Sequence, residues 1–207
     1  RVWVLNQASF GYHSHLTMVP ISLESLTRRY GRRRGVDDIT LSVPEGSLFG
    51  FLGPNGAGKT TTLRVMLGFL RPTRGAARVF GLDCWRESRR IKCDVGYLPG
   101  DLRLYPWLTG REALRLFGAI RGRDLARAGR ELADDLALDL SVKARSMSRG
   151  TRQKLGLVLA LAHEPRLLVL DGHLRGDLRP GLRPRRVVRR QSARRDVAAG
   201  FLDLRCG

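Results

Sequence analysis

The sequence contains little cysteine and no long apolar run, and both absences limit what the protein can be. The three cysteines, Cys84, Cys93 and Cys206, are odd in number and lack the spacing of metal ligands, which argues against a disulfide framework or a zinc site. The longest apolar run, residues 155–162, is far shorter than the roughly 20 residues that span a bilayer, so no transmembrane segment is expected. These absences predict a cytoplasmic protein in a reducing environment.

Acidic residues and lysine are also scarce. Asp and Glu number 19 against 38 for Lys and Arg, and the formal net charge is +19. Such a charge favours nucleic acid, anionic lipid or another polyanion as a partner, although an arginine-rich, lysine-poor composition is equally typical of a GC-rich genome. The lysines are Lys59, Lys92, Lys143 and Lys154, and the first of them lies in the most informative segment of the chain.

Residues 53–61 match the pattern G-x-x-x-x-G-K-[ST] of a phosphate-binding P-loop. The apolar run 48–52 before them has the length of a buried strand, and residues 61–67 after them can continue as a helix. This order of strand, glycine-rich loop and helix is the context in which the motif binds nucleotides. The predicted nucleotide-binding residues here are Gly53, Pro54, Asn55, Gly56, Ala57, Gly58, Lys59, Thr60 and Thr61.

Each part of this segment suits a triphosphate with bound Mg²⁺. Glycines at 53, 56 and 58 can adopt positive φ and bring backbone N–H groups close to phosphate oxygens. The helix that begins near Lys59 directs its unpaired N–H groups and the positive end of its dipole toward the same anion. Lys59 adds a charge for the outer phosphates, and the Thr60 hydroxyl is placed to bind Mg²⁺. We therefore predict nucleotide binding.

Two segments before the P-loop show the alternation that is typical of half-buried strands. Apolar and polar residues alternate over 21–24 and again over 39–43. Tyr30 lies on the turn between these segments, where an aromatic ring could stack on a nucleotide base. A partly buried structural tyrosine is the alternative for this position.

A helical region is predicted after the P-loop, at about 101–150. Thr109 and Glu112 have the spacing of a capping box, which marks the start of a helix. Behind it, helical spacing predicts one apolar face, made of Ala113, Leu116, Phe117 and Ile120.

The next helix and strand carry two further candidate sites. Ser148 is a good N-cap for a helix, and the apolar run 167–170 predicts a buried strand that ends in Asp171. A carboxylate at the carboxyl end of a strand beside a P-loop can hold the hydration shell of Mg²⁺. A helix cap or a turn is the usual role of a lone aspartate in such a place, and the P-loop favours the metal role.

In this order, the P-loop, the helical region, the helix start at Ser148 and the strand ending in Asp171 resemble the ATP-binding subunit of an ABC transporter. The match is most similar to the bacterial drug-export type and covers roughly residues 18–171. The resemblance implies an α/β fold of the P-loop NTPase class. It also implies antiparallel N-terminal strands and a helical insertion, with the C-terminal part of the fold incomplete in this chain.

The resemblance assigns roles to particular residues and implies ATP and Mg²⁺ as cofactors. Lys59 and Asp171 match catalytic positions, and Asp171 with Thr60 matches the ligands of Mg²⁺. Tyr30 matches the aromatic residue that stacks on adenine. The family's signature segment, which completes the ATP site of the opposite subunit, corresponds to Ser148, Arg149, Gly150, Thr151 and Gln153. Ser148 and Gly150 are kept, whereas Arg149 replaces the first glycine and Thr151 replaces the glutamine.

The resemblance further implies a homodimer of nucleotide-binding domains that drives membrane-spanning permease subunits. Such a subunit lies at the inner face of the cell membrane and needs no nucleic acid. The sequence also departs from the family: Gly100 stands where the family has the Q-loop glutamine, and Gly172 stands where it has the general-base glutamate. No later segment supplies an apolar strand ending in histidine. We therefore expect ATP binding with impaired hydrolysis.

Both ends of the chain lie outside the resemblance. Residues 1–17 show neither strand nor helix periodicity, and we expect an irregular N-terminal extension. Residues 172–207 contain ten arginines and three aspartates, and we expect a disordered or out-of-frame tail that lacks a buried strand. The alternative interpretation is a basic nucleic-acid-binding protein, with this tail as its electrostatic footprint and the P-loop as an accessory nucleotide site.

Overall fold

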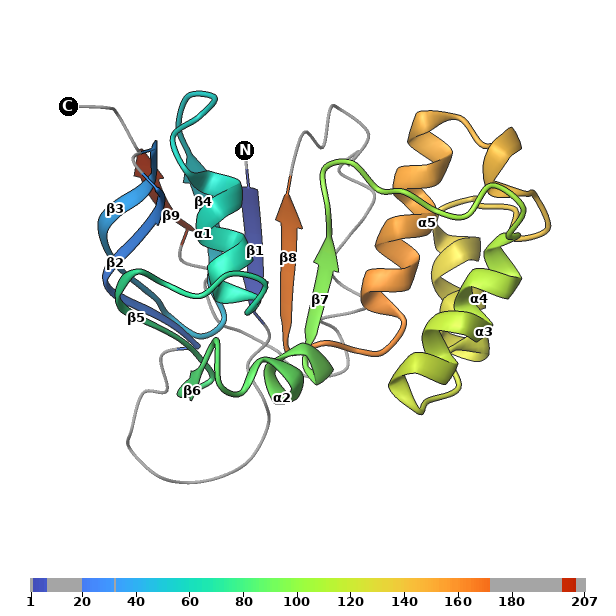
Figure 1. Ribbon diagram of the computed structural model, residues 1–207. Coiled ribbons are helices and arrows are strands. Elements are labelled where there is room, and N and C mark those ends of the chain that lie inside the picture. Colours follow the sequence, from blue (N-terminus) through green and yellow to red (C-terminus); the bar gives the residue numbers. More distant parts are fainter. Residues whose placement is uncertain (1, 7–19, 32, 172–198, 204–207) are drawn as a thin grey trace, which may run out of the picture. The chain divides into compact units, whose positions relative to one another are not determined.

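A computed structural model describes residues 2–6, 20–31, 33–171 and 199–203 (Figure 1). The described residues up to Asp94, together with 199–203, form one compact unit, and those from Val95 onward to Asp171 form a second. None of the described helices is long and apolar enough to cross a membrane. The P-loop belongs to the first unit, and the predicted signature segment belongs to the second.

The first unit contains an antiparallel sheet in the order β3-β2-β5-β6. The bounds of its strands are β2 (Ile21–Tyr30), β3 (Arg33–Val43), β5 (Arg74–Val79) and β6 (Leu82–Asp83). The alternation predicted from the sequence is confirmed, because Ile21, Leu23, Ile39 and Val43 are buried. Burial of one face of each strand fixes the register of the sheet.

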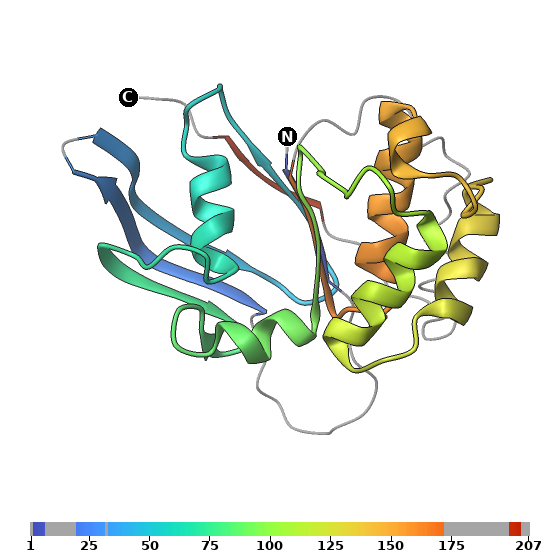
Figure 2. The same cartoon turned by 45° about the vertical axis from the view of Figure 1, so that its right-hand side comes forward.

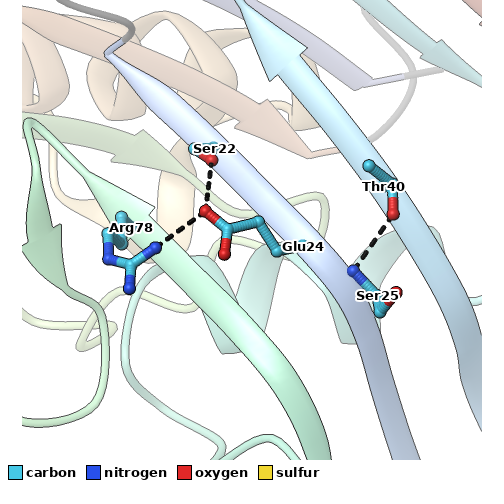
Figure 3. Close-up of polar contacts among 5 residues, drawn as sticks. All are labelled: Ser22, Glu24, Ser25, Thr40 and Arg78. Carbon is cyan, nitrogen blue, oxygen red and sulfur yellow. Dashed lines mark hydrogen bonds and ion pairs between the residues drawn. The ribbon is translucent and has the colours of Figure 1, made fainter.

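The polar face of this sheet is cross-linked by side chains (Figure 3). Glu24 accepts hydrogen bonds from Ser22 Oγ, 3.4 Å away, and from Arg78 Nη1 on β5, 2.7 Å away. The backbone N–H of Ser25 donates to Thr40 Oγ1 over 3.0 Å instead of to a ladder carbonyl. Ser25 has a φ of 43° and lies at a register shift between β2 and β3. This bulge increases the local twist of the sheet.

A second set of strands in the first unit centres on β4 (Leu48–Leu52). Strand β1 (Val2–Asn6) pairs with β4 antiparallel, and β9 (Ala199–Asp203) pairs with it parallel. The expectation of an irregular extension over residues 1–17 is therefore wrong for residues 2–6, which form a strand. The expectation of a disordered tail over residues 172–207 is likewise wrong for residues 199–203. The physical reason is that β4 is buried, and its backbone groups need hydrogen-bond partners on both sides.

Two helices complete the first unit. Helix α1 (Lys59–Met66) follows β4, and α2 (Ser88–Cys93) follows β6. Helix α1 buries Leu63, Val65 and Met66. Burial of these side chains fixes the orientation of the helix that begins at the P-loop.

The second unit holds the parallel pair β7 (Val95–Leu98) and β8 (Leu167–Asp171) with several helices. The helices are α3 (Gly110–Arg121), α4 (Ala126–Asp135), the short 3₁₀ helix η1 (Ala144–Ser146) and α5 (Arg149–Leu161). Helix α5, orange in Figures 1 and 2, packs against both α3 and α4. The predicted helical region is therefore present, and its helices share this unit with two strands.

The predicted cap of α3 is confirmed, and its predicted apolar face is correct only in part, since Ala113 is buried as expected. Thr109 and Glu112 form a reciprocal capping box, with Glu112 N donating to Thr109 Oγ1 and Thr109 N donating to Glu112 Oε2. The side chains of Leu116 and Ile120, expected to be buried, are 38% and 74% exposed. Phe117 is only half-buried.

Besides Ala113, the buried face of α3 contains Leu114 and Gly118, which the periodicity did not select. A Cβ on Gly129 of α4 would clash with the side chain of Leu114, and one on Gly118 would lie 2.5 Å from Arg123 O. Glycine at these two positions permits a close approach that larger residues would prevent. The helix consequently buries Leu114 together with Ala113 and Gly118 and leaves Ile120 in solvent.

Candidate nucleotide site

The P-loop connects β4 to α1, as the sequence predicted (Figure 1). Strand β4 ends at Leu52, residues 53–58 form the loop, and Lys59 is the first residue of α1. No described side chain caps α1, and its first turn contains no acidic residue. The positive end of the helix dipole is therefore available to an anion from outside the chain.

Two glycines of the loop have a left-handed backbone. Gly56 has a φ of 85° and Gly58 a φ of 83°, values that residues with a Cβ rarely adopt. A Cβ on Gly58 would also clash with the carbonyl oxygen of Gly35 and lie 2.7 Å from Cγ2 of Val36 on β3. Glycine is thus required at 58 both by conformation and by the space left beside β3.

The Lys59 side chain lies over its own loop. Its Nζ donates to the carbonyl oxygens of Gly53 at 2.7 Å and Pro54 at 2.6 Å. An ammonium group has three donors, so one remains for a phosphate oxygen while the other two fix the side chain. The charge is held above the loop and close to the start of α1, where it suits the outer phosphates of a triphosphate.

The threonines at the start of α1 differ in exposure. Thr60 is exposed and Thr61 is half-buried. Thr62 is buried, and its Oγ1 donates to Gly58 O over 3.1 Å. Of the three, Thr60 is thus the most accessible to a ligand, as expected for a hydroxyl that binds Mg²⁺ beside a phosphate.

Tyr30 lies at the end of β2 with 42% of its surface exposed. Its ring edge is so close to Gly35 that a Cβ there would lie 2.7 Å from Cε2 of the ring. Gly35 in turn touches Gly58 of the P-loop through its carbonyl oxygen. Tyr30 and Gly58 of the P-loop are therefore both neighbours of Gly35, and the structure brings these two predicted nucleotide contacts into the same part of the first unit.

The predicted signature segment lies in the second unit, at the start of α5. Ser148 is the N-cap, its Oγ accepting from Thr151 N at 3.1 Å, which confirms the predicted cap. A Cβ on Gly150 would meet only Ser148 Oγ among described atoms within 4 Å, at 3.9 Å. Arg149 is exposed, and Gln153 is half-buried. The packing within the described chain therefore does not explain a glycine at 150.

Asp171 is the last residue of β8 and is half-buried. The four residues before it, 167–170, are buried, which confirms the predicted strand. Since Asp171 and Thr60 belong to different units, their joint binding of Mg²⁺ stays a prediction. Residues from 172 to 198 lie outside the described residues, and so does His173.

Sequence reasoning missed two residues at this site, Gly35 and Arg28. Gly35 provides the space for Tyr30 and Gly58, and the Arg28 guanidinium lies over the Tyr30 ring, 5.1 Å from its centroid. The spacing of Arg28 and Tyr30 along one strand was a usable signal, because alternate residues share a face. Nothing in the sequence marked Gly35, since its role depends on two segments that meet only in the fold.

Comparison with known proteins gives concordant matches. The family model described as ABC transporter matches residues 36–174. The bacitracin transport ATP-binding protein BcrA of Bacillus licheniformis is 37% identical over 153 residues, which are 73% of this chain and 50% of that protein. The daunorubicin resistance ATP-binding protein DrrA3 of Streptomyces coeruleorubidus is 38% identical over 157 residues, 73% of this chain and 49% of that protein. The chain thus spans about half the length of these curated relatives.

Solved structures agree on the fold. An ATP-binding subunit of an ABC transporter superposes with a TM-score of 0.62 and 30% identity, over 70% of this chain and 62% of that one. A dimeric bacterial ABC transporter cassette, MJ0796, gives 0.64 at 24% identity over 70% of each chain, a likeness that concerns the fold alone. The predicted fold class is confirmed, and the nucleic-acid-binding alternative finds no support in these matches.

Proposed function

Because the chain belongs to the ABC transporter family, we propose that it is the ATP-binding subunit of an exporter. The bacitracin transport and daunorubicin resistance proteins among its relatives support a role in drug export. The observation that carries the proposal is the P-loop: an uncapped helix start, Gly58 packed on β3, and the Lys59 ammonium held above the loop. These groups together favour a triphosphate.

The residues of this site divide the binding of ATP among them. Backbone N–H groups at the start of α1 and the Lys59 ammonium bind the phosphates, while the Tyr30 ring stacks on adenine. Thr60 and Asp171 have the oxygen ligands that Mg²⁺ prefers, and bound Mg²⁺ neutralises charge on the outer phosphates. Lys59 adds to this by stabilising the negative charge that develops on the transferring phosphoryl group.

Hydrolysis is the weak step of the proposed activity. An attacking water needs a residue that orients it and accepts its proton, and Gly172 occupies the position at which the family has a glutamate. A glycine has no side chain to accept a proton. We therefore expect Mg·ATP to bind to this chain and to be hydrolysed slowly.

The signature segment supports a dimer that encloses ATP. Arg149 and Arg152 lie in or beside the first turn of α5, which holds no acidic residue, so the helix dipole and two cations together favour an anion. The open space beside Gly150 suits the close approach of a partner's nucleotide. ABC ATP-binding subunits pair with one another and with membrane permeases, which would place this chain at the cytoplasmic face of the cell membrane.

Calorimetric titration of the full chain with Mg·ATP tests the proposal. We expect saturable binding that weakens at least about 10-fold in Lys59→Ala, since a hydrogen bond to a charged group contributes about 1.5–3 kcal/mol. Lys143→Ala is the matched control, because Lys143 is an exposed lysine of the second unit, and its affinity should be unchanged. Equal affinities in all three proteins, or no binding to the unmodified chain, would refute nucleotide binding at the P-loop.

Release of phosphate under multiple turnover tests the second part of the proposal. We expect the unmodified chain to release phosphate slowly, and Lys59→Ala to release none above background. Rapid turnover that Lys59→Ala abolishes would show that the chain does not need the glutamate missing at position 172.

A further inference from the structure

Arg28 and Tyr30 form a stacked pair at the end of β2. The two residues are separated by one position and lie on the same face of the strand. The Arg28 guanidinium carbon lies 5.1 Å from the centroid of the Tyr30 ring, within the range of cation–π attraction. The pair belongs wholly to the first unit, as does the P-loop.

The guanidinium is fixed from behind by the loop that precedes β5. Arg28 Nη1 donates to Arg71 O over 2.9 Å. Its Nε is buried and has no hydrogen-bond partner among the described residues. The same loop is joined to β2 by two further bonds, Thr73 N to Thr27 O at 2.8 Å and Arg29 N to Thr73 Oγ1 at 3.1 Å. Arg28 is therefore a partly buried cation with little freedom to leave the ring.

The Tyr30 ring is confined on a second side by β3. Arg28 pairs with Val36 and Arg29 pairs with Arg34, so that Gly35 is the extra residue of a bulge. Because glycine has no side chain, Gly35 leaves room for the edge of the Tyr30 ring; a Cβ at this position would lie only 2.7 Å from Cε2 of the ring. The ring still exposes 42% of its surface. A ring held by a cation and a backbone thus presents its remaining surface to solvent.

We propose that Arg28 is a positioning residue for the base of the bound nucleotide and acts through Tyr30. The inference rests on the proposed function, because it requires that a nucleotide occupy the P-loop. A flexible aromatic side chain loses rotamer freedom when a base stacks on it, and this loss weakens binding. Arg28 removes that freedom in advance, since it stacks on one face of the ring and is itself held by Arg71. Base affinity, and not phosphate affinity, depends on this pair.

The test compares two ligands and four variants by calorimetric titration of the full chain. The ligands are Mg·ATP and Mg·tripolyphosphate, which shares the phosphates but has no base. The variants are Arg28→Met, Arg28→Lys, Tyr30→Ala and the double variant Arg28→Met/Tyr30→Ala. Arg29→Met is the matched control, because Arg29 is exposed and pairs with Asp37 at 3.6 Å instead of with the ring.

We expect Arg28→Met to raise the Kd for Mg·ATP about 2- to 5-fold, the factor that corresponds to an exposed cation–π contact. Its Kd for Mg·tripolyphosphate should stay within error of the unmodified value, which also shows that the P-loop is folded. Arg28→Lys retains a cation that can reach the ring, so it should restore most of the affinity for Mg·ATP. In the Tyr30→Ala background the same change at Arg28 should have no effect.

Three results would overturn the inference. The first is an unchanged affinity of Arg28→Met for Mg·ATP. The second is an affinity for both ligands that falls by the same factor. The third is an effect of Arg28→Met that persists in the Tyr30→Ala background. Each of these outcomes leaves nucleotide binding at the P-loop intact and removes only the role of Arg28. Failure of the unmodified chain to bind either ligand would instead overturn the proposed function, and this inference with it.

Discussion

Gly56 and Gly58 form a matched pair that separates backbone strain from steric contact. Their φ values are 85° and 83°, so alanine at either position is forced into the left-handed region at a cost of about 1–2 kcal/mol. A Cβ on Gly56 would meet no described atom within 4 Å, whereas one on Gly58 would clash with Gly35 O and lie 2.7 Å from Val36 Cγ2. Overpacking of this kind adds about 1–3 kcal/mol.

We therefore expect Gly56→Ala to lower the free energy of unfolding by about 1–2 kcal/mol and Gly58→Ala by about 2–5 kcal/mol. Urea unfolding followed by tryptophan fluorescence in a Trp107→Phe background measures both. Trp107 is 64% exposed, so its replacement spares the core, and the remaining tryptophans, Trp3 and Trp85, belong to the first unit. Equal losses in the two variants would refute the contact between the P-loop and β3.

Three further predictions concern the capping box and the cysteines. Thr109→Ala should lower the free energy of unfolding by about 1 kcal/mol, measured by urea unfolding. Hydrogen bonds from Thr109 lower the pKa of Glu112 below its ordinary value of 4.5. The ionised Glu112 carboxylate therefore stabilises the fold fully above pH 4.5, and this stabilisation is lost as the pH falls through the lowered pKa of the folded chain. The stability difference between Glu112→Gln and the unmodified chain should shrink accordingly in acid, and a difference independent of pH would contradict this. Burial raises the pKa of the Cys84 thiol to about 12, whereas Cys93 is exposed. In a Cys206→Ser variant at pH 8, a maleimide should therefore label Cys93 and leave Cys84 unmodified until the chain is unfolded. Rapid labelling of both cysteines would refute the burial of Cys84.

The local features of the site could be predicted because each depends on neighbouring residues. The P-loop pattern placed strand, loop and helix correctly, since its glycines and the following helix start act over a few residues. The caps at Thr109 and Ser148 were equally predictable, because a side chain three residues away completes each of them. Spacing along the chain is sufficient information for such interactions.

The buried face of α3 could not be predicted in the same way. Helical periodicity selected Leu116 and Ile120, which are exposed, because it ranks residues by hydrophobicity alone. The helix buries Leu114 and Gly118 instead, and the close approach of Gly129 to Leu114 decides this. Only the partner helix determines how near two helices can come.

The sequence by itself determined the family, the P-loop and the residue types that suit a phosphate, because these depend on spacing within one segment. Only the tertiary structure decided that Gly35 lies between Tyr30 and Gly58 and that Arg28 stacks on the Tyr30 ring. It likewise decided that β1 and β9 pair with β4. These contacts join segments far apart in the chain, and their free energies depend on distances that exist only after the sheet has formed.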